Sequence, residues 1–447
     1  MAQKTKQFLS PVWTHLTDLT VEKAAGSYIW CTQGKKYLDF ACGIGVTNTG
    51  HCHPRVVEAI QKQAATLLHG QINIVYHKPM LELVEELQPV VPKGLDTFFF
   101  SNSGAEAVEA SVKLARHATK KQNVITFQGS FHGRTIGTMS LTNSKTIYRR
   151  NYGPLMSGVH VAPYAYCYRC PLSSSSSSSS CKEEDCCDEP LQQLELLLKR
   201  ETAPEETAAV LVEPVLGEGG YTMPPVSFMR GLRRLCDKHG MLLIADEVQT
   251  GFARTGRYFG IEHFGEEARP DIMVFAKGVA SGLPLSGIVA RAELHKNWIP
   301  GTHGGTYGGN AVACAAAVAT QRVIKEEGLV ENSHKRGAQL RAALEGLKAK
   351  YPQIGDVRGP GCMIGLEFKD RVEHLRGGQT RENKDGVKYG FAGALTKNCA
   401  KHGLLLLSCG VHETIRFIPP LTIGDEEVAL GIELFEKGLQ ETIQQHN

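Results

Sequence analysis

The sequence predicts an α/β protein, in which a large domain built on a mainly parallel sheet is followed by a smaller α+β domain. Three observations support this. Apolar strands alternate with helical segments from about residue 55 onward. Strands such as "AAVLV" and "MLLIA" are continuously apolar, as is typical of parallel strands covered on both faces. Most of these strands run into a polar or glycine-rich loop, where open α/β sheets bind ligands.

The elements divide the chain into three parts. Residues 1–54 are expected to form an N-terminal arm and part of the small domain, because "GSYIWCTQGKKYLDF" has a short-strand pattern. Residues 55–310 are expected to form the large domain, with a strand, turn and helix in "TFFFSNSGAEAVEASVKLARHA" and further strands in "NVITF", "AAVLV", "MLLIA" and "DIMVF". Residues 311–447 begin with the helix "NAVACAAAVATQRVIKEEG" and continue into a C-terminal small domain with strands in "GCMIGLEF", "GLLLLSC" and "ETIRFIPP".

Bulk composition excludes several classes of protein. The 447 residues are 42% hydrophobic and 21% charged, which indicates a globular chain with a large core. A net charge of +3 is too small to suggest nucleic acid or an acidic membrane as a partner. Thirteen cysteines and an N-terminus without a secretory pattern favour reduced thiols in the cytoplasm. A mitochondrial location remains an alternative. The N-terminus has few of the arginines of a mitochondrial presequence, but this excludes such a presequence less strongly than the missing apolar segment excludes a secretory signal.

Residues 171–190 are expected to form a flexible loop, because Ser173–Ser180 is an unbroken run of serine that cannot bury apolar area. Cysteines flank this run, and Cys167, Cys170, Cys181 and Cys186 have a spacing that resembles a four-thiolate zinc site. The second pair is looser than such sites prefer. We expect that these cysteines bind no metal. The states that the sequence leaves open are free thiols in the loop, a redox disulfide and a weak metal site.

Lys277 stands out because it follows an apolar strand and is surrounded by the small residues of "KGVASG". Asp246 directly follows the strand "MLLIA", and Ser103, Gly104 and Ala105 begin a helix after the strand "TFFF". Taken one at a time, these residues could be a solvated lysine, a turn cap and an ordinary helix start. Together they match the needs of pyridoxal 5'-phosphate.

That cofactor requires three groups from a protein. Its aldehyde needs a lysine amine whose pKa falls on desolvation, a role for Lys277. Its ring nitrogen needs a carboxylate, a role for Asp246. Its phosphate needs backbone N–H groups at a helix N-terminus, which residues 103–105 would supply.

Long stretches of the chain resemble the class III aminotransferases of fold-type I, closest to 4-aminobutyrate aminotransferases. The resemblance runs from "LDFACGIGVTNTGHCHP" to "TIRFIPPLTI" and is most specific in "LLIADEVQTGFARTGRYFG" and "PDIMVFAKGVASGLPLSGIVA". It implies an enzyme that moves an amino group from an ω-amino donor, best guess 4-aminobutyrate, to the keto acid 2-oxoglutarate. It also implies a homodimer with a shared active site.

The resemblance implies a role for each residue of the site. Lys277 would form an imine with the cofactor and shuttle the proton, Asp246 would pair with the ring nitrogen, and Gln249 would hydrogen-bond the phenolic oxygen. The other expected cofactor contacts are Ser103, Gly104 and Ala105 at the phosphate, Phe131 on the ring face, His132, and Thr306 at the partner subunit's phosphate.

Five further residues are expected to bind substrate. Arg134 would take a substrate carboxylate, and Arg416 would take the α-carboxylate of 2-oxoglutarate or glutamate. Glu218 would act as a gate that pairs with Arg416 when the donor has no α-carboxylate, and Ile44 and Glu213 would line the same pocket. The plainer alternatives are a surface role for Arg134, a structural ion pair for Arg416 and a purely structural Glu218.

Other functions are compatible with the same residues. Ornithine, acetylornithine or broad ω-amine aminotransferases would share the whole set. An amino-acid racemase or a dialkylglycine decarboxylase would keep Lys277 and Asp246 and differ around the labile bond. A non-catalytic binding protein on the same fold is the third class, and the intact set of cofactor residues argues against it.

Overall fold

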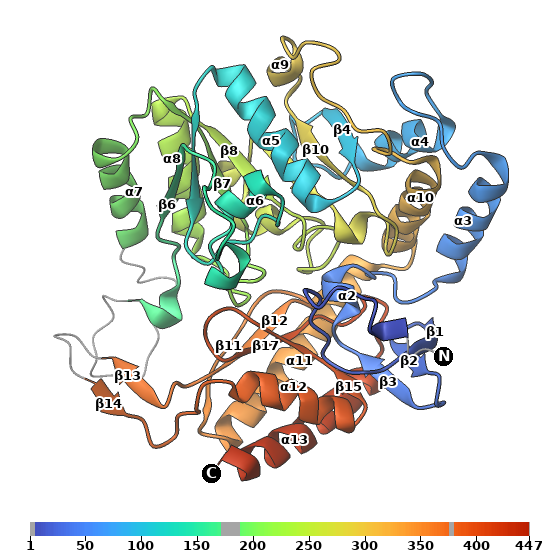
Figure 1. The fold of residues 1–447 in the computed structure, drawn as a ribbon, viewed down its shortest axis with the longest axis vertical. Coiled ribbons are helices and arrows are strands. Elements are labelled where there is room, and N and C mark those ends of the chain that lie inside the picture. Colours follow the sequence, from blue (N-terminus) through green and yellow to red (C-terminus); the bar gives the residue numbers. More distant parts are fainter. Residues whose placement is uncertain (1–4, 171–187, 375–379, 447) are drawn as a thin grey trace.

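The computed structural model describes residues 5–170, 188–374 and 380–446, and it confirms the predicted fold class (Figure 1). The central element is a seven-stranded sheet with the order β4-β10-β9-β8-β7-β5-β6. β10 is antiparallel to both of its neighbours, and the pairs from β9 to β6 are all parallel. Its strands are β4 (Thr97–Ser101), β5 (Asn123–Phe127), β6 (Val159–Ala162), β7 (Thr207–Val212), β8 (Leu242–Asp246), β9 (Ile272–Phe275) and β10 (Ser286–Ala290).

Helices cover both faces of this sheet, which explains the continuously apolar strands. Because successive strand residues point to opposite faces, Leu243 and Ile244 of β8 belong to two different cores. Leu243 shares its core with residues of α7 (Glu189–Arg200) and α8 (Val226–His239). Ile244 shares its core with α5 (Gly104–Thr119). A polar residue at either position would therefore be buried.

The smaller part of the molecule lies below the large sheet in Figure 1 and has its own core. Its antiparallel sheet has the order β11-β12-β17-β16, with β11 (Ile354–Arg358), β12 (Ile364–Phe368), β16 (Leu407–Cys409) and β17 (Thr414–Phe417). Its helices are α11 (Leu329–Lys350), α12 (Phe391–Lys401) and α13 (Asp425–His446), and β13 (Val372–His374) pairs with β14 (Thr380–Glu382).

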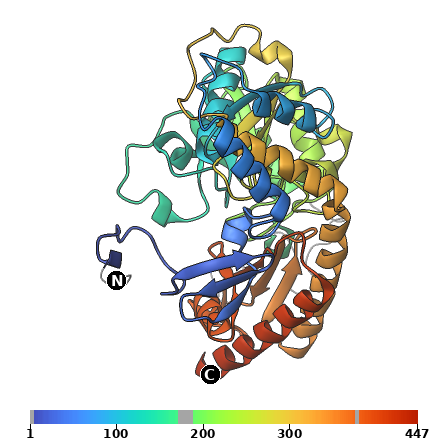
Figure 2. The same ribbon diagram turned by 90° about the vertical axis from the view of Figure 1, so that its right-hand side faces the viewer.

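The N-terminal strands join this smaller part. β1 (Val21–Ala25), β2 (Tyr28–Cys31) and β3 (Lys36–Asp39) form a sheet that β15 (Leu404–Leu405) completes by parallel pairing with β3. Leu38 and Phe40 consequently lie in the same core as α11, α12 and α13. Figure 2 shows the blue N-terminal strands beside the red C-terminal helix.

Helix α10 (Ala311–Glu326) packs against the large part of the molecule. It contacts α3 (Pro54–Thr66) and α4 (Lys78–Leu87), and Cys314 belongs to the core of the large part. We therefore propose that the domain division follows α10, later in the chain than the predicted boundary at residue 311. Within the described ranges, no helix is both long and apolar enough to cross a bilayer.

Arg254 connects the segment after β8 to the small domain. Its guanidinium is fully buried and donates to the carbonyl oxygens of Cys362 and Pro419 and, at 2.8 Å, to Asn48 Oδ1. Asn48 in turn donates to the carbonyl of Phe252 at 2.7 Å. These bonds satisfy a buried charge with several acceptors and set the small domain against the end of β8, where the candidate site lies.

Candidate active site

A cavity of about 340 Å³ lies at the carboxyl ends of the parallel strands. It is lined by residues from six separate segments of the chain, between Val46 and Leu285. The structure brings together there most of the residues that the sequence singled out, namely Ser103, Gly104, Ala105, Phe131, His132, Glu213, Glu218, Asp246, Gln249 and Lys277.

Lys277 begins a short 3-10 turn two residues after β9 ends at Phe275. Its backbone φ of 44° is unusual for a residue with a side chain and is typical of a functional position. Burial lowers the pKa of Lys277 to about 8, and the charge of Arg416 acts in the same direction, while Glu218 and Asp246 oppose it. A large fraction of Lys277 side chains is therefore neutral and nucleophilic at mildly alkaline pH.

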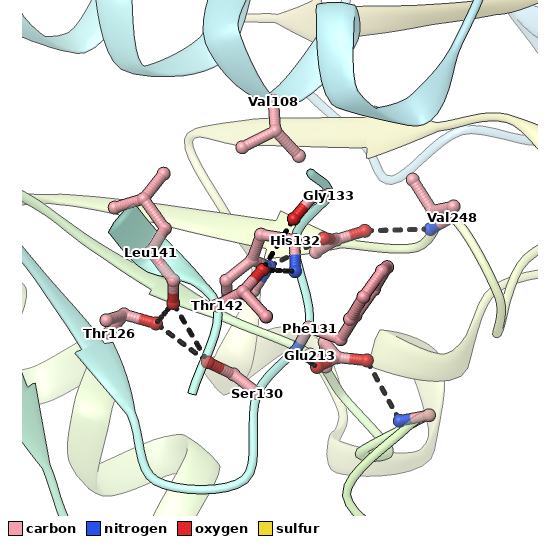
Figure 3. Close-up of polar contacts among 12 residues, drawn as sticks. Val108, Thr126, Ser130, Phe131, His132, Gly133, Leu141, Thr142, Glu213 and Val248 are labelled. Carbon is pink, nitrogen blue, oxygen red and sulfur yellow. Dashed lines mark hydrogen bonds and ion pairs between the residues drawn. The ribbon is translucent and has the colours of Figure 1, made fainter. Parts of the chain in front are cut away.

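Asp246 and His132 form a buried pair on the cavity wall. Asp246 Oδ2 lies 2.7 Å from His132 Nδ1, and Asp246 Oδ1 accepts from the backbone N–H of Val248 at 3.0 Å. The backbone N–H of His132 donates to Thr142 Oγ1 at 3.0 Å, which fixes the ring beside the carboxylate (Figure 3). Each carboxylate oxygen keeps a free lone pair, so Asp246 can still accept a hydrogen bond from a group in the cavity.

Glu213 connects two segments that border the cavity. Its Oε1 accepts from the backbone N–H of Phe131 at 2.8 Å, and its Oε2 accepts from that of Gly217 at 2.9 Å (Figure 3). Burial raises the pKa of Glu213 to about 7, since the nearby His132 only partly offsets desolvation. Glu213 is thus a link between the backbone of Phe131 and the loop that carries Glu218.

The N-terminus of α5 supplies free backbone donors to the cavity. Ser103 and Glu106 form a capping box, in which Ser103 Oγ accepts from the N–H of Glu106 at 3.3 Å and Glu106 Oε2 accepts from the N–H of Ser103 at 2.7 Å. Gly104 and Ala105 occupy the first helical positions, whose N–H groups have no partner within the helix. A Cβ on Gly104 would lie 3.1 Å from the Val248 side chain, so glycine allows this close approach.

Glu218 and Arg416 form an ion pair at the boundary between the two domains. Arg416 lies on β17 and donates through Nη1 to Glu218 Oε1, and both residues are more than nine-tenths buried. Burial alone would raise the pKa of Glu218, but the charge and hydrogen bond of Arg416 outweigh it and hold that pKa below its usual value. Arg416 Nε has no partner within the described structure, so the guanidinium retains capacity for a second carboxylate.

The residues that line the cavity have several independent features that fit pyridoxal phosphate. The cavity holds an amine with a lowered pKa, a buried carboxylate and the exposed N–H groups of a long helix. Gln249 is 7% exposed and its Oε1 has no partner in the described structure. A buried amide without a partner is costly, so a bound polar group beside Gln249 would satisfy it.

Four predicted residues lie outside the cavity lining: Arg416, which pairs with the lining residue Glu218, and Ile44, Arg134 and Thr306. Ile44 is 37% exposed with a φ of 68°, in a segment where a Cβ on Gly45 would touch the Gln249 side chain. Arg134 is exposed near the mouth, where its charge affects Tyr148. Thr306 is exposed.

Two residues near the Glu218–Arg416 pair were not predicted from the sequence. The charge of Lys145 lowers the pKa of Glu218, and the ring of Tyr148 contacts Phe131 edge-on, with centroids 5.2 Å apart. Both come from "SKTIYRR", a basic and aromatic stretch that follows the "FHGRT" motif. That composition was the available signal, but nothing in the sequence places the stretch over Glu218.

The cysteine cluster is only partly described. Cys167 and Cys170 lie at the two ends of the turn that contains η2 (Cys167–Arg169), whereas Cys181 and Cys186 and most of the predicted loop fall outside the described residues. Within the described ranges, no group of three or more side chains is arranged to bind a metal ion.

Comparison with known proteins gives a consistent result. Residues 9–439 match the family model described as aminotransferase class-III. A probable 4-aminobutyrate aminotransferase of Bacillus subtilis is 39% identical over 440 residues, which cover 98% of this chain and 97% of that protein. A 4-aminobutyrate aminotransferase of Escherichia coli and a 5-aminovalerate aminotransferase of Pseudomonas aeruginosa are also 39% identical, with 99% and 95% of this chain covered and 99% and 94% of those proteins.

Solved structures show the same similarity in three dimensions. An amine transaminase from an uncultivated Pseudomonas species, in its PLP-bound form, superimposes with a TM-score of 0.87 at 28% identity and covers 98% of this chain and 99% of that one. The ornithine aminotransferase of Toxoplasma gondii superimposes with a TM-score of 0.82 at 28% identity and covers 100% of this chain and 95% of that one.

The lowered pKa of Lys277 leads to a prediction about its reactivity. In protein freed of any bound aldehyde, we expect an amine-directed reagent such as trinitrobenzenesulfonate to label Lys277 with a half-maximal rate near pH 8, because the neutral amine, present above the pKa, is the reactive form. Peptide mapping after short exposures across pH 6–10 (roughly two pH units on either side of the pKa) measures this. A Lys277 profile that follows that of the exposed Lys388 would contradict it.

Proposed function

This chain belongs to the class III aminotransferases, and we propose that it moves an amino group from an ω-amino acid, 4-aminobutyrate in the first place, to 2-oxoglutarate. The family makes it a pyridoxal-phosphate-dependent transaminase that acts on an amine and a keto acid. The observation that supports the choice of substrates is the buried Glu218–Arg416 pair, which leaves one positive charge that can be exposed or neutralised.

Lys277 is the proposed catalytic base. When bound, pyridoxal phosphate supplies an aldehyde that takes up amines and a ring that accepts electrons. Lys277 Nζ would remove the proton from the donor carbon that carries the nitrogen and later return a proton to the other end of the same system. Its pKa of about 8 suits both transfers, because a base and its conjugate acid are then both available near neutral pH.

Asp246 would keep the cofactor ring protonated. Its carboxylate is 4% exposed and is held by His132 and by the N–H of Val248, so it can meet a ring nitrogen without reorganising. His132 is then a positioning residue for Asp246. The N–H groups of Gly104 and Ala105 would bind the phosphate at the positive end of the α5 dipole.

The Glu218–Arg416 pair would let one pocket accept two kinds of substrate. A donor without an α-carboxylate would leave Arg416 as an uncompensated buried charge, which costs about 3–5 kcal/mol. Glu218 removes this cost while the donor reacts. When the keto acid arrives, its carboxylate would replace Glu218 on the guanidinium, where an arginine binds such a group in a bidentate manner.

The distal carboxylate of the donor would be bound near the cavity mouth. Arg134 is exposed there, and Lys145 lies close enough for its charge to act on Glu218. Two cations near one rim would attract a monocarboxylate amine and align its amino group with Lys277. A relative named acetylornithine aminotransferase is 37% identical over 97% of this chain, so acetylornithine is the second candidate donor.

We also propose a homodimer whose sites are shared between subunits. Segments 67–76 and 304–309 lie together, as shown by the contact of the His69 ring with that of Tyr307 at 5.2 Å. They expose large apolar side chains, with Ile74 and Tyr76 each 79% exposed and Tyr307 64% exposed. A surface of this kind beside Thr306 is typical of a subunit interface.

The cytoplasmic location remains a prediction.

A donor panel tests the proposed substrate. With 2-oxoglutarate as acceptor, we expect kcat/KM to be highest for 4-aminobutyrate and lower for β-alanine, 5-aminovalerate, ornithine, acetylornithine, lysine and a simple aryl amine. One methylene in a pocket is worth about 1–3 kcal/mol, so the neighbours in chain length should fall by roughly 10-fold or more. A higher value for acetylornithine would instead favour the second candidate.

The gate predicts unequal effects on the two half-reactions. Glu218→Ala should slow cofactor conversion by 4-aminobutyrate by roughly 100-fold, because it exposes the charge of Arg416, and should change conversion by glutamate little. Arg416→Ala should do the reverse. Single-turnover spectra with each amine measure both rates. Equal losses in Glu218→Ala would assign it a structural role only.

The dimer predicts that one surface substitution affects the active site. Ile74→Asp should shift the protein toward monomer and lower activity in proportion, because a charge would be buried in the interface. Leu430→Asp on α13, an apolar position that is 37% exposed and lies outside the proposed interface, is the control. Sedimentation at assay concentrations measures the mass, and a fully active monomer would contradict the shared site.

A further inference from the structure

The backbone of the loop around Glu218 is held at three points. The N–H of Gly217 donates to Glu213 Oε2 at 2.9 Å, and the carbonyl of Glu218 accepts from the N–H of Gly410 at 2.7 Å. The carbonyl of Gly220 accepts from both Nε and Nη2 of Arg358, at 3.0 and 2.7 Å. The loop is therefore fixed on both sides of Glu218, once by the large domain and twice by the small one.

Arg358 is itself held firmly in place. It lies at the end of β11, and its Nη2 also donates to Glu367 Oε2 at 2.7 Å, while Nη1 donates to Asp356 Oδ2 at 2.9 Å. Its guanidinium lies over the ring of Tyr166, 4.9 Å from the centroid. Glu367 is fully buried on β12, so Arg358 is fixed to the centre of the small-domain sheet.

The close contact between Arg358 and the loop depends on glycine. Gly220 has a φ of 111°, and a Cβ on it would lie 3.0 Å from Arg358 Nη2. Gly365 of β12 approaches from the other side, since a Cβ on it would lie 3.0 Å from the Gly220 carbonyl oxygen. The backbone and the guanidinium are thus packed as tightly as their atoms allow.

The Glu218 side chain is anchored differently from its backbone. Its carboxylate is held by Arg416 on β17, a neighbour of β12 in the same sheet as Arg358. The loop backbone and the Glu218 carboxylate are therefore both held by arginines of one sheet, Arg358 and Arg416. Rotation about the side-chain bonds of Glu218 can break the ion pair while the loop stays in place.

We propose that Arg358 is a positioning residue for the gate: by holding the Gly220 carbonyl it returns Glu218 to Arg416 after each turnover, and so it governs the use of donors that lack an α-carboxylate. The inference rests on the proposed function, because it assumes that the Glu218–Arg416 pair opens and closes. Loss of this hold leaves Arg416 intact for glutamate and affects only the state in which Glu218 must neutralise it.

The test uses Arg358→Lys in the holoenzyme. Lysine keeps a positive charge beside Glu367 but lacks the planar fork that donates twice to Gly220. We expect single-turnover conversion by 4-aminobutyrate to slow roughly 10-fold, as for the loss of hydrogen bonds from a charged donor, and conversion by glutamate to stay within about 2-fold. Arg336→Lys is the matched control, because Arg336 is a buried arginine of the same domain that pairs with Asp425; both of its rates should stay unchanged.

Three outcomes would overturn the inference. Parallel losses in both half-reactions of Arg358→Lys would mean that Arg358 is structural. Unchanged rates in Arg358→Lys, with a clear split in Glu218→Ala, would mean that the gate works without Arg358. Equal losses in Glu218→Ala would remove the gate itself and with it the proposed function of Glu218.

A second variant covers the case in which Arg358→Lys does not fold. Gly220→Ala disturbs the same contact from the loop side and keeps both Arg358 and Glu367 in the chain. It should show the same preferential loss with 4-aminobutyrate, whereas equal losses with both amines would count against the inference.

Discussion

The ion pair between Glu218 and Arg416 is the interaction on which the rest of this site depends. It brings a carboxylate from the large domain and a guanidinium from the small one into a space with little solvent. Neither charge is tolerable there alone, since an unpaired buried charge costs about 3–5 kcal/mol. The contact between the large sheet's loop and the smaller sheet is therefore coupled to the pairing of these two residues.

The same desolvation governs the chemistry of Lys277. A lysine in water would be almost fully charged at neutral pH, but burial lowers the pKa of Lys277 to about 8. The carboxylates around it limit that shift, and they differ in state: the pKa of Glu218 is below its usual value beside Arg416, whereas burial raises the pKa of Glu213 to about 7. A reactive amine is thus maintained among groups whose charges nearly balance.

In the proposed gate, a rigid scaffold would serve two substrates. The backbone near Glu218 is bonded to Glu213 on one side and to Arg358 on the other, so the moving part of the proposed gate would be one side chain. A side-chain rotation orders far fewer atoms than the movement of a whole loop, and its entropy cost is correspondingly smaller. The glycines at 217, 219 and 220 supply the close backbone contacts that make this arrangement fit.

The sequence alone determined the local features. Buried parallel strands are recognisable from continuous apolar runs, and the residues at or just after their carboxyl ends, such as Asp246 and Lys277, are placed at one edge of the sheet by strand direction alone. Ser103 and Glu106 likewise specify a helix start through a contact only three residues apart. Only the tertiary structure decided the partners: Glu218 and Arg416 are 198 residues apart, and Arg358 reaches Gly220 across 138. Such pairings follow from how two domains pack, and no periodicity or spacing in the chain encodes the distance between their surfaces.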